Sequence, residues 1–80
     1  SGPDYDAQPV TVYPNVTDDY ITISGLGSKE FKTTIYNQLG QRVFNNNNQK
    51  SINVSKLPAG VYILEVNCSQ QLSPLKFIKN

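Results

Sequence analysis

Apolar and polar residues alternate along most of this sequence, in short runs that turn-forming residues separate. The clearest runs lie at residues 20–24, 31–36 and 61–68. Alternation with a period of two is typical of half-buried β-strands, whereas no stretch has the apolar spacing of a helix. The sequence therefore predicts an all-β fold.

Short strands are expected about every 8 to 12 residues, with turn signals between them. They are predicted at residues 10–13, 20–24, 31–36, 41–44, 52–54, 61–68 and 75–79. This spacing is typical of a two-sheet sandwich. We therefore predict an immunoglobulin-like antiparallel β-sandwich of about seven short strands, although the Cys, Trp and Cys signature of antibody domains is absent.

Two turns have clear sequence signals. Asn37 and Gly40 take the first and fourth positions of one turn, the preference of a type I turn followed by a residue with positive φ. A second turn is predicted to begin at Leu57, with Pro58 in its second position and Gly60 in its fourth. These turns should close a hairpin and lead into the longest strand.

The longest predicted strand has its apolar residues in phase. Tyr62, Leu64, Val66 and Cys68 share the face that we expect to point into the core. Cys68 is the only cysteine, so an internal disulfide is excluded and a small buried hydrophobe is expected. Residues 45–49 are uniformly polar by contrast, and they are expected to form an exposed loop tip.

The composition gives little support to catalysis or to nucleic-acid binding. The chain has no histidine and one cysteine, so the commonest general base and the usual zinc ligands are lacking. Seven basic and six acidic residues are spread along the 80 residues, without a basic stripe for a phosphate backbone. We therefore expect no enzyme activity, no cofactor, no metal and no nucleic-acid partner.

Two binding hypotheses stay open beside these exclusions. The first is a calcium site, because the loop before residue 20 contains oxygen ligands, although a solvated loop is the simpler interpretation. The second is a carbohydrate-binding or adhesive sandwich, because exposed aromatic faces can stack on sugar rings, although tyrosine also suits strands in general. The calcium ligands would be Asn15, Asp18 and Asp19, and the sugar platform would use Tyr13, Tyr20 and Tyr36.

Residues 1–9 differ from the rest of the chain. Gly, Pro, Asp, Gln and Ser dominate them, a composition that cannot bury itself. The first three residues, Ser1, Gly2 and Pro3, are typical of the scar that a cleaved purification tag leaves. We predict a linker or tag remnant at residues 1–9 and one domain at residues 10–80.

Four stretches, taken in order, resemble a known family. They are residues 12–15 (VYPN), 35–41 (IYNQLGQ), 52–64 (INVSKLPAGVYIL) and 76–79 (KFIK). Together they resemble the type A C-terminal sorting domain of the type IX (Por) secretion system of Bacteroidetes. Val16 departs from the proline that is usual in that family after the first stretch. The motif residues that carry the resemblance are Tyr13, Pro14, Asn15, Asn37, Gly40, Leu57, Pro58, Gly60 and Tyr62.

The resemblance implies a non-catalytic export signal attached to an N-terminal cargo. The cargo would enter the periplasm, and the outer-membrane translocon would recognise the domain. A sortase-like peptidase would then remove it, leaving the cargo at the cell surface or outside the cell. The expected cleavage region is Ala7, Gln8 and Pro9, in the linker before the first strand.

The last predicted strand is a natural docking element for the translocon, since it lies at a sheet edge. We expect recognition through Leu75, Lys76, Phe77, Ile78 and Lys79, with Lys76 and Lys79 pointing outward. Exposed edges also make a dimer through strand pairing plausible. An inert spacer resembling fibronectin-type repeats is a further alternative to the sorting function.

Overall fold

A computed structural model describes residues 10–27, 29–68 and 71–80, and this part of the chain contains strands and turns but no helix. Alternating apolar residues form eight strands. They are β1 (Thr11–Tyr13), β2 (Val16–Thr17), β3 (Tyr20–Ser24), β4 (Lys32–Tyr36), β5 (Arg42–Asn47), β6 (Ser51–Asn53), β7 (Gly60–Cys68) and β8 (Gln71–Lys79).

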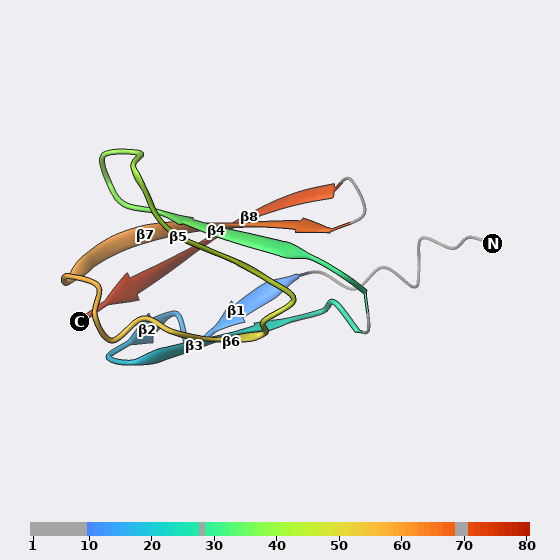
Figure 1. Ribbon diagram of the computed structural model, residues 1–80. Coiled ribbons are helices and arrows are strands. Elements are labelled where there is room, and N and C mark those ends of the chain that lie inside the picture. The colour runs from blue at the N-terminus through green and yellow to red at the C-terminus, as the bar shows by residue number, and fades with distance from the viewer. Residues whose placement is uncertain (1–9, 28, 69–70) are drawn as a thin grey trace.

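The strands form two facing sheets, which Figure 1 shows as an upper and a lower layer, except that β2, an edge strand of the five-stranded sheet, is drawn at the level of the lower layer. One sheet has three strands in the order β1-β3-β6, and the other has five in the order β2-β8-β7-β4-β5. Neighbouring strands are antiparallel except for β2 and β8, which are parallel. The predicted all-β sandwich is confirmed. At its start the chain passes from the three-stranded sheet, in β1, to the five-stranded sheet, in β2.

Beyond shifts of one residue, three strands differ from the prediction. The two-residue strand β2 was not expected, because a stretch this short has no periodicity of its own. The predicted loop tip at residues 45–49 was partly wrong, because Asn45, Asn46 and Asn47 pair with β4 as the end of β5. Pairing with a neighbouring strand therefore outweighs the low strand propensity of asparagine.

Strand β8 begins at Gln71 rather than at residue 75, so Pro74 lies inside it. Ile78 and Asn80 donate their main-chain N–H groups toward the β2 side of the strand. Main-chain N–H groups alternate sides along a strand, so the nitrogen of Pro74, four residues before Ile78, faces that side too. β2 pairs only with the last two residues of β8, so no strand requires an N–H from Pro74. Proline is tolerated at this position because it lies on an open edge.

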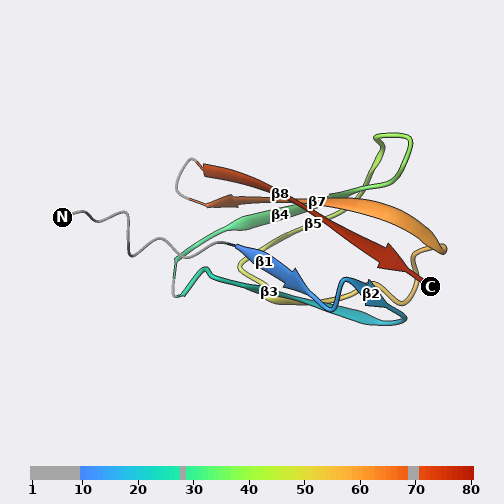
Figure 2. The same ribbon diagram turned by 180° about the vertical axis from the view of Figure 1, so that it is seen from behind.

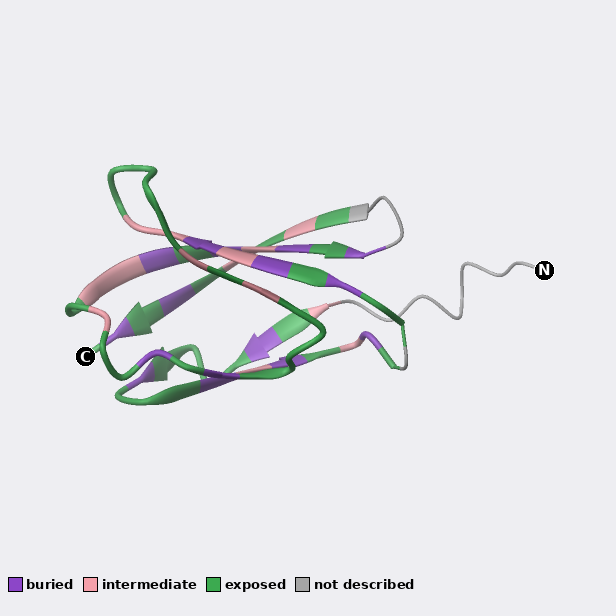
Figure 3. Ribbon diagram, viewed as in Figure 1, coloured by how far each residue is buried: buried purple, intermediate pink, exposed green. Residues whose placement is uncertain are grey.

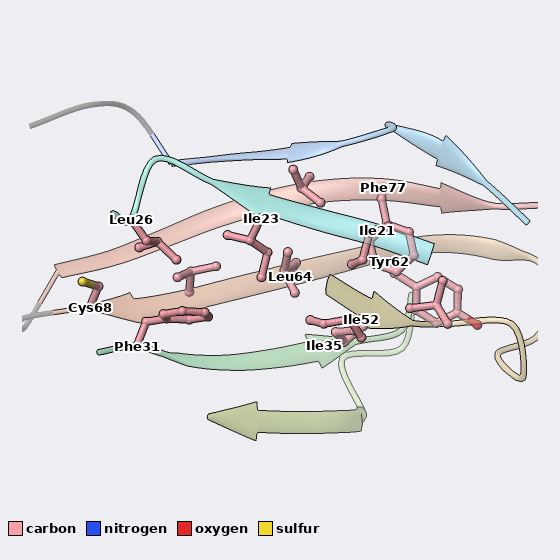
Figure 4. Close-up of a cluster of buried hydrophobic side chains, with 13 residues drawn as sticks. Ile21, Ile23, Leu26, Phe31, Ile35, Ile52, Tyr62, Leu64, Cys68 and Phe77 are labelled. Atoms are coloured by element: carbon pink, nitrogen blue, oxygen red, sulfur yellow. The ribbon is translucent and has the colours of Figure 1, made fainter. Parts of the chain in front are cut away.

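The inner faces of the two sheets form one apolar core (Figure 4). Burial alternates along the strands, as the colouring of Figure 3 shows. The aromatic rings of Tyr62 and Phe77 stack across β7 and β8, with centroids 5.4 Å apart and planes inclined by 15°. The predicted inward face of β7 is confirmed, since Tyr62, Leu64, Val66 and Cys68 are all buried.

The turn at residues 37–40 has the predicted form. Gly40 donates its main-chain N–H to the Asn37 carbonyl at 3.0 Å and has a φ of 81°. The Asn37 side-chain oxygen accepts from the main-chain N–H groups of Leu39 at 2.9 Å and Gln41 at 3.0 Å. The asparagine side chain therefore fixes the hairpin between β4 and β5.

The second predicted turn is displaced along the chain. Leu57 donates its main-chain N–H to the Val54 carbonyl at 3.0 Å, so the hydrogen-bonded turn ends where the predicted one begins. The Tyr62 hydroxyl donates to the Pro58 carbonyl at 2.6 Å. Tyr62 lies near the start of β7. A tyrosine near the start of a strand that bonds back to the preceding loop is a hallmark of immunoglobulin-like sandwiches. The loop before β7 is thus fixed to the strand that follows it.

Candidate recognition surface

The terminal strand β8 lies between β7 and β2, so the expectation that its last residues form a sheet edge was wrong. Ile78 donates its main-chain N–H to the Asn15 carbonyl at 2.7 Å, and Asn80 donates to the Thr17 carbonyl at 2.9 Å. The Asn80 side chain also donates to the Asp18 carboxylate at 3.0 Å. The stretch after β1 therefore fixes the end of the chain.

The loop around Asp18 and Asp19 has a structural role. Asp19 accepts from the main-chain N–H of Tyr20 at 2.7 Å, while Asp18 holds Asn80. Within the described residues, no three side chains of the metal-ligating types His, Cys, Asp and Glu lie together. Both carboxylates named in the calcium hypothesis thus accept hydrogen bonds from this chain.

The five residues predicted for recognition are divided between the two faces of β8. Leu75, Phe77 and Lys79 point inward, because they are in phase with the core side of the strand, while Lys76 and Ile78 are exposed on the outer side. The expectation that Lys79 points outward was wrong, since the residue is only 8% exposed. Its ammonium group donates to the main-chain oxygen of Asn80 at 2.9 Å. Of these five, only Lys76 and Ile78 are exposed enough for a partner to contact them broadly.

The outer face of the five-stranded sheet has an apolar centre between two cations. Tyr36, Ile63 and Lys76 lie directly opposite one another on neighbouring strands, and a β-bulge in β5 brings Arg42 opposite Tyr36. These four side chains form one row across the sheet. A second row beside it is entirely apolar and consists of Val61, Ile78 and Val16. Together the two rows form an apolar strip with a positive charge on either side of Tyr36 and Ile63.

The hairpin that joins β4 and β5 rises above this strip. Figures 1 and 2 show its tip projecting from the five-stranded sheet on the side away from the other sheet. Beside it lies a surface hollow lined by Tyr36, Asn37, Gln38, Gly40, Val61, Ile63 and Glu65. A second hollow continues from it to the loop before β7, with Leu39 and Pro58 in its lining. Leu39 is 81% exposed at the tip of the hairpin.

Three of the four motif stretches form this end of the molecule, and the remaining one is hydrogen-bonded to it. The stretch 35–41 supplies the hairpin, 52–64 supplies the loop before β7 and its first outward residues, and 76–79 supplies the neighbouring strand. The first stretch, 12–15, reaches it through the hydrogen bond from Ile78 to Asn15. We call the two rows and the hairpin tip the motif surface; it consists of Val16, Tyr36, Leu39, Arg42, Val61, Ile63, Lys76 and Ile78.

The chain matches one protein family along nearly all of its length. Residues 11–80 match a family described as the secretion system C-terminal sorting domain. The chain belongs to this family of type IX sorting domains. A search of curated proteins gave no significant match.

Membership has three direct consequences for the sorting domain. The family is a secretion signal rather than a class of catalytic domains. It implies attachment to a cargo protein and interaction with the type IX machinery. It also implies export of that cargo to the cell surface or beyond. In the part of the chain that the structure describes, no helix is long and apolar enough to span a membrane.

Sequence reasoning located the terminal strand of the sorting domain but missed most of the motif surface. The phase of residues 62–68 predicted the inward face of β7, yet nothing in the local pattern indicated that Tyr36, Ile63 and Lys76 lie in one row on the opposite side. Leu39 carried a usable signal, because a large apolar residue in a four-residue turn is unusual among polar turn formers. The hollow itself depends on two loops that are distant in sequence.

Proposed function

We propose that this sorting domain is a non-catalytic signal that the outer-membrane type IX translocon recognises through the motif surface. The observation that carries this proposal is the convergence of three of the four motif stretches on one end of the five-stranded sheet, while the fourth is bonded to that end through the Asn15 carbonyl. Within that surface, Lys76 and Ile78 are the exposed representatives of the terminal strand. The buried members, Phe77 and Lys79, support the strand from inside.

The direction of the chain suits a signal that is attached to a cargo. Figures 1 and 2 place the start of β1 at one end of the sandwich, and the hairpin tip and the C-terminus at the other. A cargo joined before Val10 would therefore leave the motif surface open to the translocon. The periplasmic route and the association with the outer membrane are parts of the same proposal.

Cleavage is proposed in the segment before β1. Ala7, Gln8 and Pro9 lie outside the described residues, so the proposal rests on the position of the first strand alone. A cut before Val10 by the sortase-like peptidase would separate the cargo without breaking any strand. We treat residues 1–9 as the linker and residues 10–80 as the signal.

A reporter fusion tests this function. The whole 80-residue chain is fused behind a periplasmic reporter in a type IX-competent cell and in a matched strain without the translocon. Surface protease accessibility and the medium fraction measure export, and mass spectrometry of the exported reporter locates its C-terminal end. We expect export only in the competent strain, and a new end within residues 7–9.

Two results would contradict parts of this proposal. Equal export from both strains would exclude the domain as a type IX signal. Export of an uncut fusion, or a cut inside a strand, would refute the proposed cleavage segment while leaving the sorting function intact. Deleting residues 76–80 is not a useful variant, because the deletion removes the buried Phe77 and so damages the fold itself.

A further inference from the structure

The exposed Leu39 is not required by the turn in which it lies. Asn37 supplies the side-chain oxygen that accepts two main-chain N–H groups, and Gly40 supplies the positive φ. The Leu39 side chain contributes to neither, and at 81% exposure it buries almost no apolar surface within the domain. Its placement at the tip of a projecting hairpin therefore suits contact with another molecule.

The space beside Leu39 lies between two loops that come close to each other. The Gln38 side-chain nitrogen lies 3.7 Å from the position that a Cβ on Gly60 would take, so the hairpin closely approaches the loop before β7. That loop is in turn fixed by the bond from the Tyr62 hydroxyl to the Pro58 carbonyl at 2.6 Å. The hairpin tip therefore projects from a supported base, which favours a defined binding geometry.

The charges around the hollow indicate the chemistry of a partner. Arg42 and Lys76 lie at the two ends of the row that contains Tyr36 and Ile63, and both are exposed. Glu65 lies one row further along the sheet and is the acidic residue of the hollow's lining. An apolar centre between two cations is complementary to an apolar surface that acidic residues border.

We propose that the motif surface docks onto a protein partner that has an apolar pocket bordered by acidic residues, with Leu39 entering the pocket and Arg42 and Lys76 facing the acidic border. This inference rests on the proposed sorting function and specifies its recognition step. Apolar anchors in desolvated pockets contribute most of the affinity of such interfaces, while charges at the rim govern salt dependence and association rate.

Binding to outer-membrane vesicles tests the proposal. The 80-residue chain is titrated against vesicles from a type IX-competent bacterium and against vesicles from a strain without the translocon, and sedimentation gives the bound fraction. Leu39→Ser should weaken translocon-dependent binding by about tenfold. The matched control is Leu72→Ser, since Leu72 is also an exposed leucine, at 55%, but lies at the far end of β8. It should bind as the unmodified chain does.

Charge reversal tests the acidic border separately. Arg42→Glu should lower binding at low salt and flatten its decrease between about 50 and 500 mM salt, since surface charges are screened over this range. The control is Lys32→Glu, which makes the same charge change on the same face, in the row that contains Leu72. Each variant is first checked for unchanged cooperative unfolding in urea.

The outcomes separate the inference from the function on which it rests. If the unmodified chain binds both kinds of vesicle equally, the sorting function itself fails. If translocon-dependent binding is present but Leu39→Ser binds as tightly as Leu72→Ser, the pocket for Leu39 is refuted. If Arg42→Glu and Lys32→Glu have equal effects, the acidic border is refuted, and the attraction is a general property of the whole face.

Discussion

The outer faces of the two sheets differ in chemistry, although both cover the same core. The face of the five-stranded sheet has an apolar strip and charged side chains at its borders. The strands of the three-stranded sheet, with the sequences TVY, YITIS and SIN, contain no charged residue. Their outward positions are Thr11, Tyr13, Tyr20, Thr22, Ser24, Ser51 and Asn53.

Core packing does not impose this difference. Packing restricts the inward residues of both sheets in the same way, and both inner faces are apolar. Packing does not restrict the outward residues in this way. Side chains such as Thr and Tyr combine a high strand propensity with a hydroxyl group that can hydrogen-bond to water. The aliphatic residues on one outer face therefore suit the proposed contact with a partner, whereas the large exposed residues of the other face, Tyr13 and Tyr20, carry hydroxyl groups.

The largest effect is expected from the core that the two faces share. Phe77→Ala removes a fully buried ring that stacks on Tyr62, and should lower the free energy of unfolding by about 3 to 5 kcal/mol. A domain of this size has little more stability than that, so both faces should be lost together. Urea unfolding followed by circular dichroism measures the change. A well-folded Phe77→Ala variant would show that the core tolerates loss of this ring.

The second prediction changes the apolar strip without changing the core. Ile63→Thr combined with Ile78→Thr keeps β-branched residues in both strands, so the free energy of unfolding should fall by only about 1 kcal/mol. Export of the reporter fusion should fall about tenfold, because both side chains belong to the apolar strip of the motif surface. Surface-exposed reporter is measured at equal expression. Normal export of this folded variant would remove the functional distinction between the two faces.

The third prediction raises stability and leaves both faces unchanged. Thr33 is completely buried, and its hydroxyl has no hydrogen-bond partner in the described part of the chain. Thr33→Val keeps the β-branched shape and removes the unsatisfied hydroxyl, so the free energy of unfolding should rise by about 1 kcal/mol. Urea titration of the two proteins measures this gain. Export should stay unchanged, and a lower stability would mean that the hydroxyl is satisfied in solution.

Local patterns allowed much of the fold to be predicted. The alternation at residues 61–68 correctly assigned the inward face of β7, and the asparagine and glycine of the turn at residues 37–40 correctly identified its hairpin. Both features depend on residues that are neighbours in the chain. The two sheets followed from the number and spacing of such strands.

The remaining features depend on contacts between distant segments. The parallel pairing of Val16 with Ile78 joins the two ends of the chain, and neither end carries a signal for it. The inward position of Lys79 follows from the phase of β8 and contradicts the usual exposure of lysine. The row from Arg42 to Lys76 needs the register of three strand pairs, which a single sequence does not contain.

The smallest effect is expected on the outer face of the three-stranded sheet. Tyr13 and Tyr20 are 54% and 48% exposed there, on adjacent strands, while Tyr36 lies on the other sheet. Tyr13→Thr combined with Tyr20→Thr removes both rings and keeps residues that suit strands, so export should stay within about twofold of the unmodified fusion. The same pair tests the carbohydrate hypothesis, because loss of both rings should abolish any retention on insoluble polysaccharide. If this double variant lowers export as much as Ile63→Thr with Ile78→Thr does, then the export machinery contacts both outer faces of the sandwich. The proposed distinction between the two faces would then be wrong.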